Sequence, residues 1–311
     1  MLLLELLLLT LGFVLLVKGA DWFVEGASGI ADKFGIPQLV IGLTIVAMGT
    51  SAPEAAVSIT AALKGNADIT VGNVVGSNIL NVFIILGIAS VITAIAVAKT
   101  TIRYEIPIML AVTLLLLAFG TTGGTINFME GILLLVCFVG YLGYMFLMMK
   151  KGEMQAEEIE SSNAPVWKML LMGVIGLVLI IVGSDFTVDA ATALAKMFGM
   201  SERFIGLTIV ALGTSLPELF TSVVAARKGK ADIAIGNIVG SNIFNILFVV
   251  GLSALVIPVV FASEFIIDCL IAFAAGVILW LCTFKNKKLT RSGGVLMLCC
   301  YAAYFAYLLI K

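Results

Sequence analysis

A short polar stretch occurs twice, each time in the middle of a long apolar segment. It reads Gly-Thr-Ser-Ala-Pro-Glu at residues 49–54 and Gly-Thr-Ser-Leu-Pro-Glu at residues 213–218, an offset of 164. A carboxylate is costly inside a bilayer, and Pro interrupts a helix by removing a backbone donor. Two such stretches at matching places in two halves of one chain are typical of transporters built from repeats.

The composition is that of a polytopic membrane protein. Hydrophobic residues make up 61% of the chain and charged residues 12%, against about 25% charged in an average soluble domain. The net charge of −1 gives no electrostatic footprint for nucleic acid. The absence of His excludes His-based catalysis, His metal sites and His proton relays. The five cysteines lack metal-ligand spacing and are interpreted as small core side chains. The apolar N-terminal segment is interpreted as a span and not as a signal peptide.

We expect an all-α polytopic membrane protein with ten transmembrane helices in two inverted five-helix repeats. The predicted spans are 2–20, 37–63, 70–98, 104–121 and 126–149 in the first half, and 166–186, 202–226, 234–260, 262–284 and 291–310 in the second. The first repeat is residues 1–149 and the second is 166–311. The polar stretch 150–165 between them is predicted to be a cytoplasmic linker.

The repeat and its orientation follow from alignment and from the basic residues. Residues 41–81 and 205–245 align without a gap and share 28 of 41 positions. Of the 18 Lys and Arg residues, 14 fall on the side that holds the linker, so we expect both termini to face outside. Because each half has an odd number of predicted spans, the second half would insert upside down.

The polar groups at these positions all carry oxygen. Thr50, Glu54 and Ser58 are four residues apart and share a helix face, as do Ser77 and Asn81, and the second half repeats the pattern. The prolines would also free backbone carbonyls one turn earlier. Oxygen ligands suit Ca²⁺ and Na⁺, whereas Mg²⁺ demands a tighter octahedron. Two carboxylates can neutralise one Ca²⁺, or accept Na⁺ or protons after it leaves.

Structural explanations remain for some of these residues. One Gly-Thr-Ser-x-Pro-Glu stretch alone could be a kinked helix, but a second copy that is also followed by Gly-Ser-Asn disfavours this. Asp68 and Asp232 are interpreted as solvated turn residues. Asp21 and Asp185 are interpreted as helix-end groups, with entry-site carboxylates as the alternative.

The two motif pairs carry a family resemblance. Residues 47–54 with 72–81 resemble the first α-repeat of the cation/calcium exchanger superfamily, and residues 211–218 with 236–245 resemble the second. Over essentially its full length the chain is similar to the compact prokaryotic sodium/calcium exchangers. The resemblance implies cation sites at the bilayer midplane and two helices, spans one and six, that slide across a fixed bundle. The smooth apolar interiors of these two spans fit sliding; the alternative is that they are ordinary peripheral helices.

The resemblance also implies a set of ligands. Glu54 and Glu218 would be the shared acidic ligands. Hydroxyl, amide and backbone oxygens would come from Ala47, Thr50, Ser51, Ser77, Asn81, Ala211, Thr214, Ser215, Ser241 and Asn245. Some members, notably the potassium-dependent ones, have Asp where this chain has Asn245. The amide leaves two carboxylates and argues against potassium co-transport.

We therefore predict an antiporter of the prokaryotic plasma or inner membrane that exchanges Ca²⁺ for Na⁺, and not an enzyme. A Ca²⁺/H⁺ antiporter is the alternative within the class. A passive cation channel is a weaker alternative, because this chain carries both half-sites itself. An intramembrane serine peptidase is disfavoured because no His or Lys is available as the base. The expected partners are inorganic cations and the lipid bilayer, with no cofactor, no nucleic acid and no obligatory protein partner.

Overall fold

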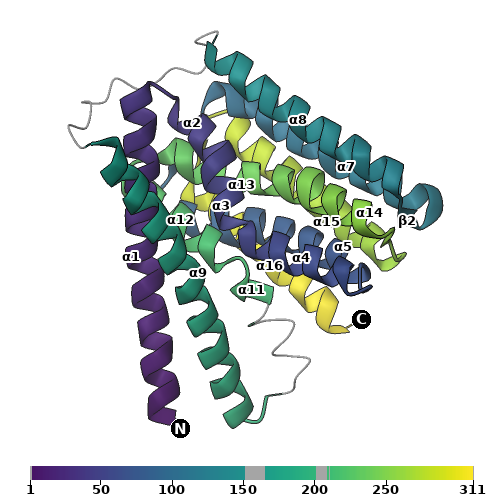
Figure 1. Cartoon of the computed structure of the whole chain (residues 1–311), viewed down its shortest axis with the longest axis horizontal. Coiled ribbons are helices and arrows are strands. Elements are labelled where there is room, and N and C mark those ends of the chain that lie inside the picture. The colour runs from purple at the N-terminus through teal and green to yellow at the C-terminus, as the bar shows by residue number, and fades with distance from the viewer. Residues whose placement is uncertain (1, 151–164, 201–208, 210, 311) are drawn as a thin grey trace.

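The structure, a computed structural model, describes residues 2–150, 165–200, 209 and 211–310 (Figure 1). In the first half the elements are α1 (Leu2–Phe34), α2 (Gln38–Ile41), η1 (Gly42–Val46), α3 (Ala47–Thr50), α4 (Ala52–Leu63), α5 (Asp68–Leu80), η2 (Asn81–Leu86), α6 (Gly87–Ile92), β1 (Ile95–Ala96), η3 (Thr101–Glu105), α7 (Ile106–Gly123), β2 (Thr125–Ile126) and α8 (Phe128–Lys150). In the second half they are α9 (Val166–Met197), α11 (Ala211–Gly213), α12 (Leu216–Arg227), α13 (Ala231–Phe244), η5 (Asn245–Val250), α14 (Gly251–Val256), β3 (Val259–Val260), α15 (Glu264–Phe284), β4 (Lys288–Leu289) and α16 (Arg291–Ile310).

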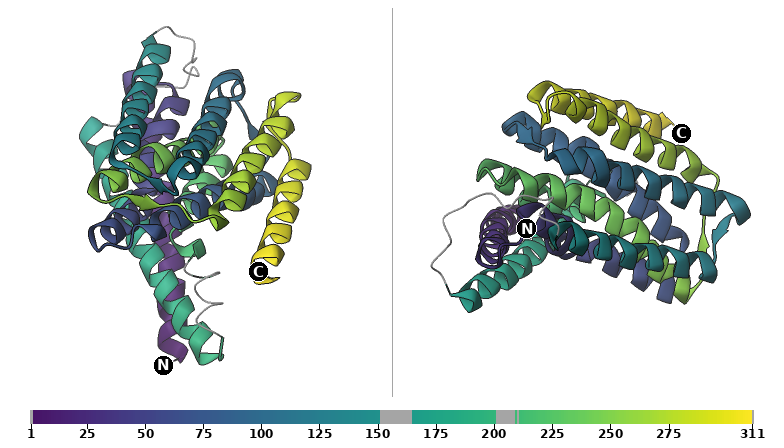
Figure 2. Two further views of the ribbon diagram at one scale, coloured as in Figure 1. Left: turned by 90° about the vertical axis from the view of Figure 1, so that its right-hand side faces the viewer. Right: turned by 90° about the horizontal axis from the view of Figure 1, so that it is seen from above.

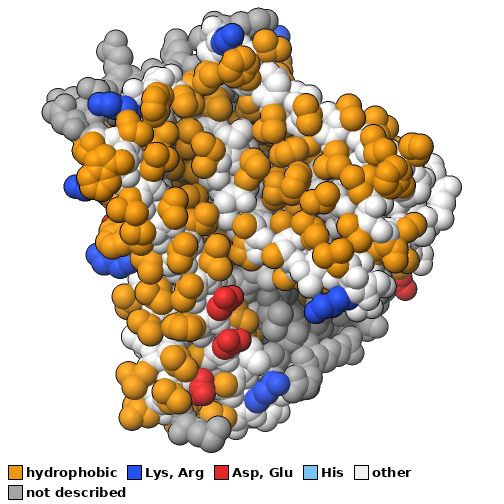
Figure 3. Space-filling view, in the orientation of Figure 1, with side chains coloured by type: hydrophobic (Ala, Val, Ile, Leu, Met, Phe, Trp, Pro, Cys, Tyr) orange, Lys and Arg blue, Asp and Glu red, His pale blue; other side chains and the backbone are white. Residues whose placement is uncertain are grey.

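The described residues give a mostly helical protein with eight helices long and apolar enough to cross a membrane. The bent pair formed by Gln38–Thr50 and Ala52–Leu63, counted as one span, is a ninth candidate. The predicted span 202–226 lies partly outside the described residues, and its described part is α11 and α12. The predicted linker, 150–165, lies almost wholly outside them as well. Large hydrophobic side chains cover much of the surface, as a lipid-facing exterior requires (Figure 3).

Two predicted spans are longer than their apolar runs. The helix that begins at Leu2 continues to Phe34, and the helix that begins at Val166 continues to Met197. Asp21 and Asp185 therefore lie inside these helices, and their interpretation as helix-end groups is wrong. Asp21 is half-buried and Asp185 is exposed, and the helix continues past each of them.

The second predicted span is broken at its polar stretch. Ser51 has φ −82° and ψ 8°, which ends α3, and Pro53 falls in the first turn of α4. The two pieces meet at an angle of 49°. Pro is well tolerated in a first helical turn, because the N–H that it lacks would have no partner there.

Four described segments are π-helical, a feature that the sequence analysis did not anticipate: η1, η2, η3 and η5. The segments η2 and η5 begin at Asn81 and Asn245, and η1 ends immediately before Ala47. π-Helical turns commonly occur at functional sites, since they rotate the side chains that follow them.

Four two-residue strands correct the all-α prediction. β1 pairs with β4, and β2 pairs with β3, both antiparallel, so each small sheet takes one strand from each half of the chain. These residues lie where spans end, and pairing satisfies backbone groups that helices leave open.

Helices α1 and α9 form a pair at the side of the bundle, running in opposite directions and steeply across the other helices (Figures 1 and 2). Their backbones meet at glycines. A Cβ at Gly19 would lie 2.8 Å from the carbonyl oxygen of Gly176, and one at Gly12 would lie 2.9 Å from that of Gly183. The centre of the bundle is α13, where every residue from Ile233 to Phe244 is buried.

Candidate cation site

The two predicted carboxylates lie at the breaks of their spans and are almost completely buried. Glu54 and Glu218 are each 1% exposed. Each sits in the first turn of the helix that follows the break, with Pro53 or Pro217 immediately before it. No described Lys or Arg forms a salt bridge with either carboxylate. In their charged form, two carboxylates at this depth are unfavourable unless a cation balances them.

Serines tie each carboxylate to the opposite half of the chain. Ser51 Oγ donates to Glu218 Oε1 at 2.8 Å, and Ser215 Oγ donates to Glu54 Oε1 at 3.4 Å. The two bonds are equivalent: in each, the serine of one half donates to the carboxylate of the other half. They join the breaks of the two spans.

Two asparagines, one in each half, form hydrogen bonds to the helix that carries the carboxylate of the same half. Asn73 Nδ2 donates to Ser58 Oγ at 2.9 Å and to the Glu54 carbonyl at 3.1 Å. Asn237 makes the matching bonds to Ser222 Oγ at 3.0 Å and to the Glu218 carbonyl at 3.4 Å. These bonds fix where each carboxylate-bearing turn lies.

Asn237 also reaches across the halves, because its Oδ1 accepts from Thr50 Oγ1 at 2.9 Å. Thr50 is completely buried and also lies 3.3 Å from the Ala47 carbonyl, to which it donates. The same carbonyl accepts from Ser51 N at 3.0 Å and from Ser241 Oγ at 3.4 Å. Ser241 Oγ therefore lies beside the Ala47 carbonyl, which is already hydrogen-bonded.

Four more asparagines form hydrogen bonds between the span made of α5 and η2 and the span made of α13 and η5. Asn78 Nδ2 donates to the Asn242 carbonyl at 3.1 Å, and Asn242 Nδ2 donates to the Asn78 carbonyl at 3.2 Å. Asn81 Nδ2 donates to Asn242 Oδ1 at 2.9 Å, and Asn245 Nδ2 donates to Asn78 Oδ1 at 3.2 Å. All the amide nitrogens are engaged as donors, which leaves the oxygens of Asn81 and Asn245 as the free ends.

Four buried side-chain oxygens at this centre have no hydrogen-bond partner. They are Glu54 Oε2, Glu218 Oε2, Asn81 Oδ1 and Asn245 Oδ1. Buried acceptors are almost always satisfied, so four of them within one set of motifs indicate a ligand-binding function. Two carboxylate and two amide oxygens match the ligands of hard cations.

The remaining predicted ligands take no part in the hydrogen bonds described above. Ser77 is buried, and Thr214 is half-buried in the turn between α11 and α12. The side chain of Ala211 lies outside the described part of the chain. The carbonyl freed by Pro217 belongs to Gly213, and it accepts a hydrogen bond from Ser184 Oγ at 2.8 Å. Ser184 thus gives α9 a polar contact to the bundle that its smooth interior did not predict.

Six residues of this network were absent from the predicted ligand set: Ser58, Asn73, Asn78, Ser222, Asn237 and Asn242. A signal for them was present, since the repeated Gly-Asn-x-Val-Gly-Ser-Asn pattern contains four of them in matching places. Their bonds to backbone carbonyls and serines make them structural braces around the predicted ligands.

A family model for the sodium/calcium exchanger protein matches residues 4–147 and 168–310. The chain belongs to the sodium/calcium exchanger family. The resemblance drawn from the two motifs is confirmed, and the family is one of membrane exchangers and not of enzymes.

Relatives and solved structures agree with this membership. The putative antiporter CaxA of Alkalimonas amylolytica is 42% identical, over 96% of this chain and 97% of its own length. The sodium/calcium exchanger MaX1 of Methanosarcina acetivorans is 32% identical, over 97% of both chains. A structure of the sodium-calcium exchanger NCX_Mj superimposes with a TM-score of 0.86 at 32% identity, covering 99% of this chain and 100% of that one. The protein is thus a multi-pass membrane protein of the prokaryotic exchanger type.

Proposed function

We propose that this protein is a secondary active antiporter that exchanges Ca²⁺ for Na⁺ across the prokaryotic plasma or inner membrane. The observation that carries the proposal is the facing pair of buried carboxylates, Glu54 and Glu218, each with one oxygen that has no partner. Family membership and the likeness to MaX1 and NCX_Mj support Na⁺ as the coupling ion over H⁺.

Ca²⁺ or Na⁺ would bind between the two broken spans. The proposed ligands are Ala47, Thr50, Ser51, Glu54, Ser77, Asn81, Ala211, Thr214, Ser215, Glu218, Ser241 and Asn245. Ca²⁺ takes 6–8 oxygens, so the set is large enough for it together with water. Ca²⁺ would draw the serine hydroxyls and carboxylates toward itself, and their present hydrogen bonds to one another hold them ready for this exchange of partners.

We infer that the fold consists of two inverted repeats, 1–149 and 166–311, joined by a cytoplasmic linker at 150–165, with both termini outside. The reciprocal bonds of Ser51 and Ser215 support a two-fold relation between the halves. So does the exchange of strands in the two small sheets. The antiparallel pair α1 and α9 would slide together and expose the cations first to one side of the membrane and then to the other.

Calcium flux into proteoliposomes tests the function. The full chain is reconstituted, and ⁴⁵Ca²⁺ uptake is measured with Na⁺ loaded inside, with a pH gradient alone, and with neither gradient. We expect uptake that requires the outward Na⁺ gradient. Uptake driven only by the pH gradient would replace Na⁺ by H⁺, and uptake that needs no gradient would identify a channel instead of an exchanger.

A further inference from the structure

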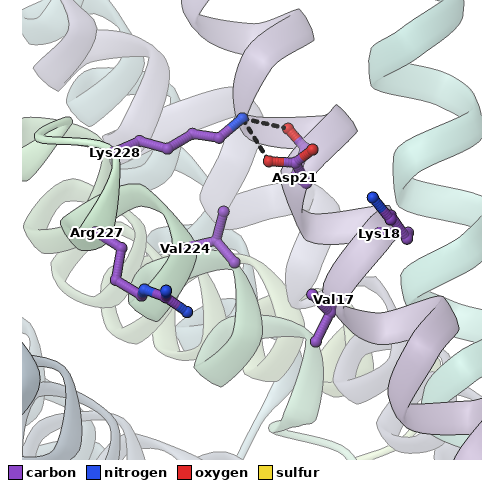
Figure 4. Close-up of a pocket in the computed structure, with 6 residues that line it drawn as sticks. All are labelled: Val17, Lys18, Asp21, Val224, Arg227 and Lys228. Carbon is purple, nitrogen blue, oxygen red and sulfur yellow. Dashed lines mark hydrogen bonds and ion pairs between the residues drawn. The ribbon is translucent and has the colours of Figure 1, made fainter.

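The end of α12 is fastened to α1 by a cluster of charges. Lys228 caps α12, and its Nζ lies 2.6 Å from Asp21 Oδ1 and 3.4 Å from Glu25 Oε2. Lys228 also donates to the Asp21 carbonyl at 3.2 Å, as Figure 4 shows. Asp21 and Lys228 line a surface cavity of about 350 Å³ between the two helices. Two further basic residues, Lys18 and Arg227, line the same cavity.

Helix α1 lies along one face of α12. That face carries Phe220, Val224 and Lys228, which are four residues apart and therefore in line. The Phe220 ring packs against Phe13 of α1 with centroids 6.0 Å apart, and Val224 faces the cavity together with Val17. We call this face of α12, formed by Phe220, Val224 and Lys228, the seat of α1. It holds α1 by a ring contact, an apolar contact and an ion pair.

The same kinds of residue recur at the offset of 164, between α4 of the first half and α9 of the second. Lys64 of α4 corresponds to Lys228, and Asp185 and Asp189 of α9 correspond to Asp21 and Glu25. These three residues form no ionic cluster among the described residues. Lys64, Asp185 and Asp189 are all exposed, and the salt bridges recorded for the described residues do not join them.

Within the described residues, no helix covers the face of α4 that corresponds to the seat on α12. It carries Ala56, Thr60 and Lys64, and these residues line a shallow groove of about 460 Å³. Among the described residues, α9 makes no extensive contact with α4 to match the one that α1 makes with α12. In the described part of the chain, the face of α12 is covered by α1, whereas the matching face of α4 is not covered by α9.

We propose that Asp21 and Glu25 with Lys228, and Asp185 and Asp189 with Lys64, are alternating ionic latches that hold α1 and α9 in the two access states. This inference rests on the proposed exchange by alternating access. The glycine contacts between α1 and α9 make the two helices one body, so a shift that seats α9 on α4 must lift α1 from α12. Partly exposed ion pairs are weak, which suits a contact that must break in each cycle.

The test uses the full chain without its native cysteines, in proteoliposomes that turn over under Ca²⁺/Ca²⁺ exchange, so that both states are populated. A reporter, Val57→Cys, lies in the groove on α4, where Val57 is 43% exposed. Its reaction rate with an uncharged maleimide reports how often the groove is open. The matched variants are Asp21→Asn and Asp185→Asn, both on moving helices and away from the reporter. Lys285→Gln in the exposed turn after α15 is the control for a change of charge.

We expect Asp21→Asn to slow the labelling and Asp185→Asn to speed it, each by about two- to fivefold, the scale of one partly exposed ion pair. The double variant should return toward the parent rate. The proposal is overturned if Asp21→Asn behaves like Lys285→Gln, or if both variants shift the rate in the same direction. Labelling does not depend on the coupling ion. Opposite shifts without Na⁺-driven uptake would therefore refute the proposed function and leave the latches standing, and the reverse outcome would refute the latches alone.

Discussion

At the scale of single residues, the site is defined by which oxygens are bonded and which are free. Ser51 and Ser215 each satisfy one oxygen of a carboxylate from the other half, and the second oxygen of each carboxylate stays free. Breaking one member of such a set should therefore affect the whole site and not one half of it.

We predict that Glu54→Gln and Glu218→Gln each reduce Ca²⁺ transport by at least about tenfold. Each change removes half of the negative charge that faces a divalent ion, and contacts to a charged group are worth about 1.5–3 kcal/mol. The measurement is Na⁺-driven ⁴⁵Ca²⁺ uptake at equal protein density, with the exposed Glu264→Gln as the control. Near-normal flux in either variant would remove that carboxylate from the site.

We predict that Asn245→Asp makes transport more sensitive to pH or to K⁺. The amide oxygen of Asn245 is buried and free, so the variant would place a third carboxylate beside the other two. Such a charge needs a proton or another cation to balance it. Exchange is measured across pH and K⁺ concentration, with Asn66→Asp in an exposed turn as the control. Unchanged profiles would show that Asn245 does not face the cations.

Much of this chemistry could be predicted from the sequence, because the repeated motifs supply the oxygens and helical spacing places them on shared faces. The partners could not be predicted. Thr50 and Asn237 are 187 residues apart, and Ser51 and Glu218 are 167 apart. Bonds across such separations depend on how the two halves meet, which no local pattern records.

At the scale of helices, the α1–α9 pair differs most from the prediction. Its ends were misplaced because Asp21 and Asp185 were expected to stop the helices. Asp21 is instead held by Lys228, 207 residues away. The π-helical turns were also missed, because they differ from α-helix in backbone hydrogen bonding and no residue type marks them. The broken span, by contrast, followed from one proline in an apolar run.

We predict that Gly19→Leu prevents α1 and α9 from packing and stops exchange. A Cβ at this position would lie within 3 Å of the α9 backbone, and overpacking of this kind costs about 1–3 kcal/mol. Thermal unfolding of the purified protein and Na⁺-driven uptake are both measured. Gly140→Leu is the control, because a Cβ there would meet nothing within 4 Å. Full exchange in the Gly19 variant would mean that close backbone contact is not required.

At the scale of the whole molecule, the question is which end faces the cytoplasm. We predict that Asn286→Cys, in the turn between α15 and α16, is labelled only after cells are permeabilised, whereas Asn66→Cys, in the turn between α4 and α5, is labelled from outside. Both positions are exposed, and the excess of Lys and Arg lies on the Asn286 side. The background is a variant without cysteines. The opposite labelling pattern would invert the protein in the membrane.

The contacts between the halves also bear on how the chain is made. β1 pairs with β4, and Asn78 bonds Asn242 in both directions, so each half completes the other. During translation the first half enters the membrane well before its partners exist. Until then its strand residues are unpaired and Glu54 lacks the hydroxyl of Ser215. The first half alone therefore cannot complete either small sheet or the hydrogen bonds around its carboxylate, and a chain that stopped at the linker would not be half of an exchanger.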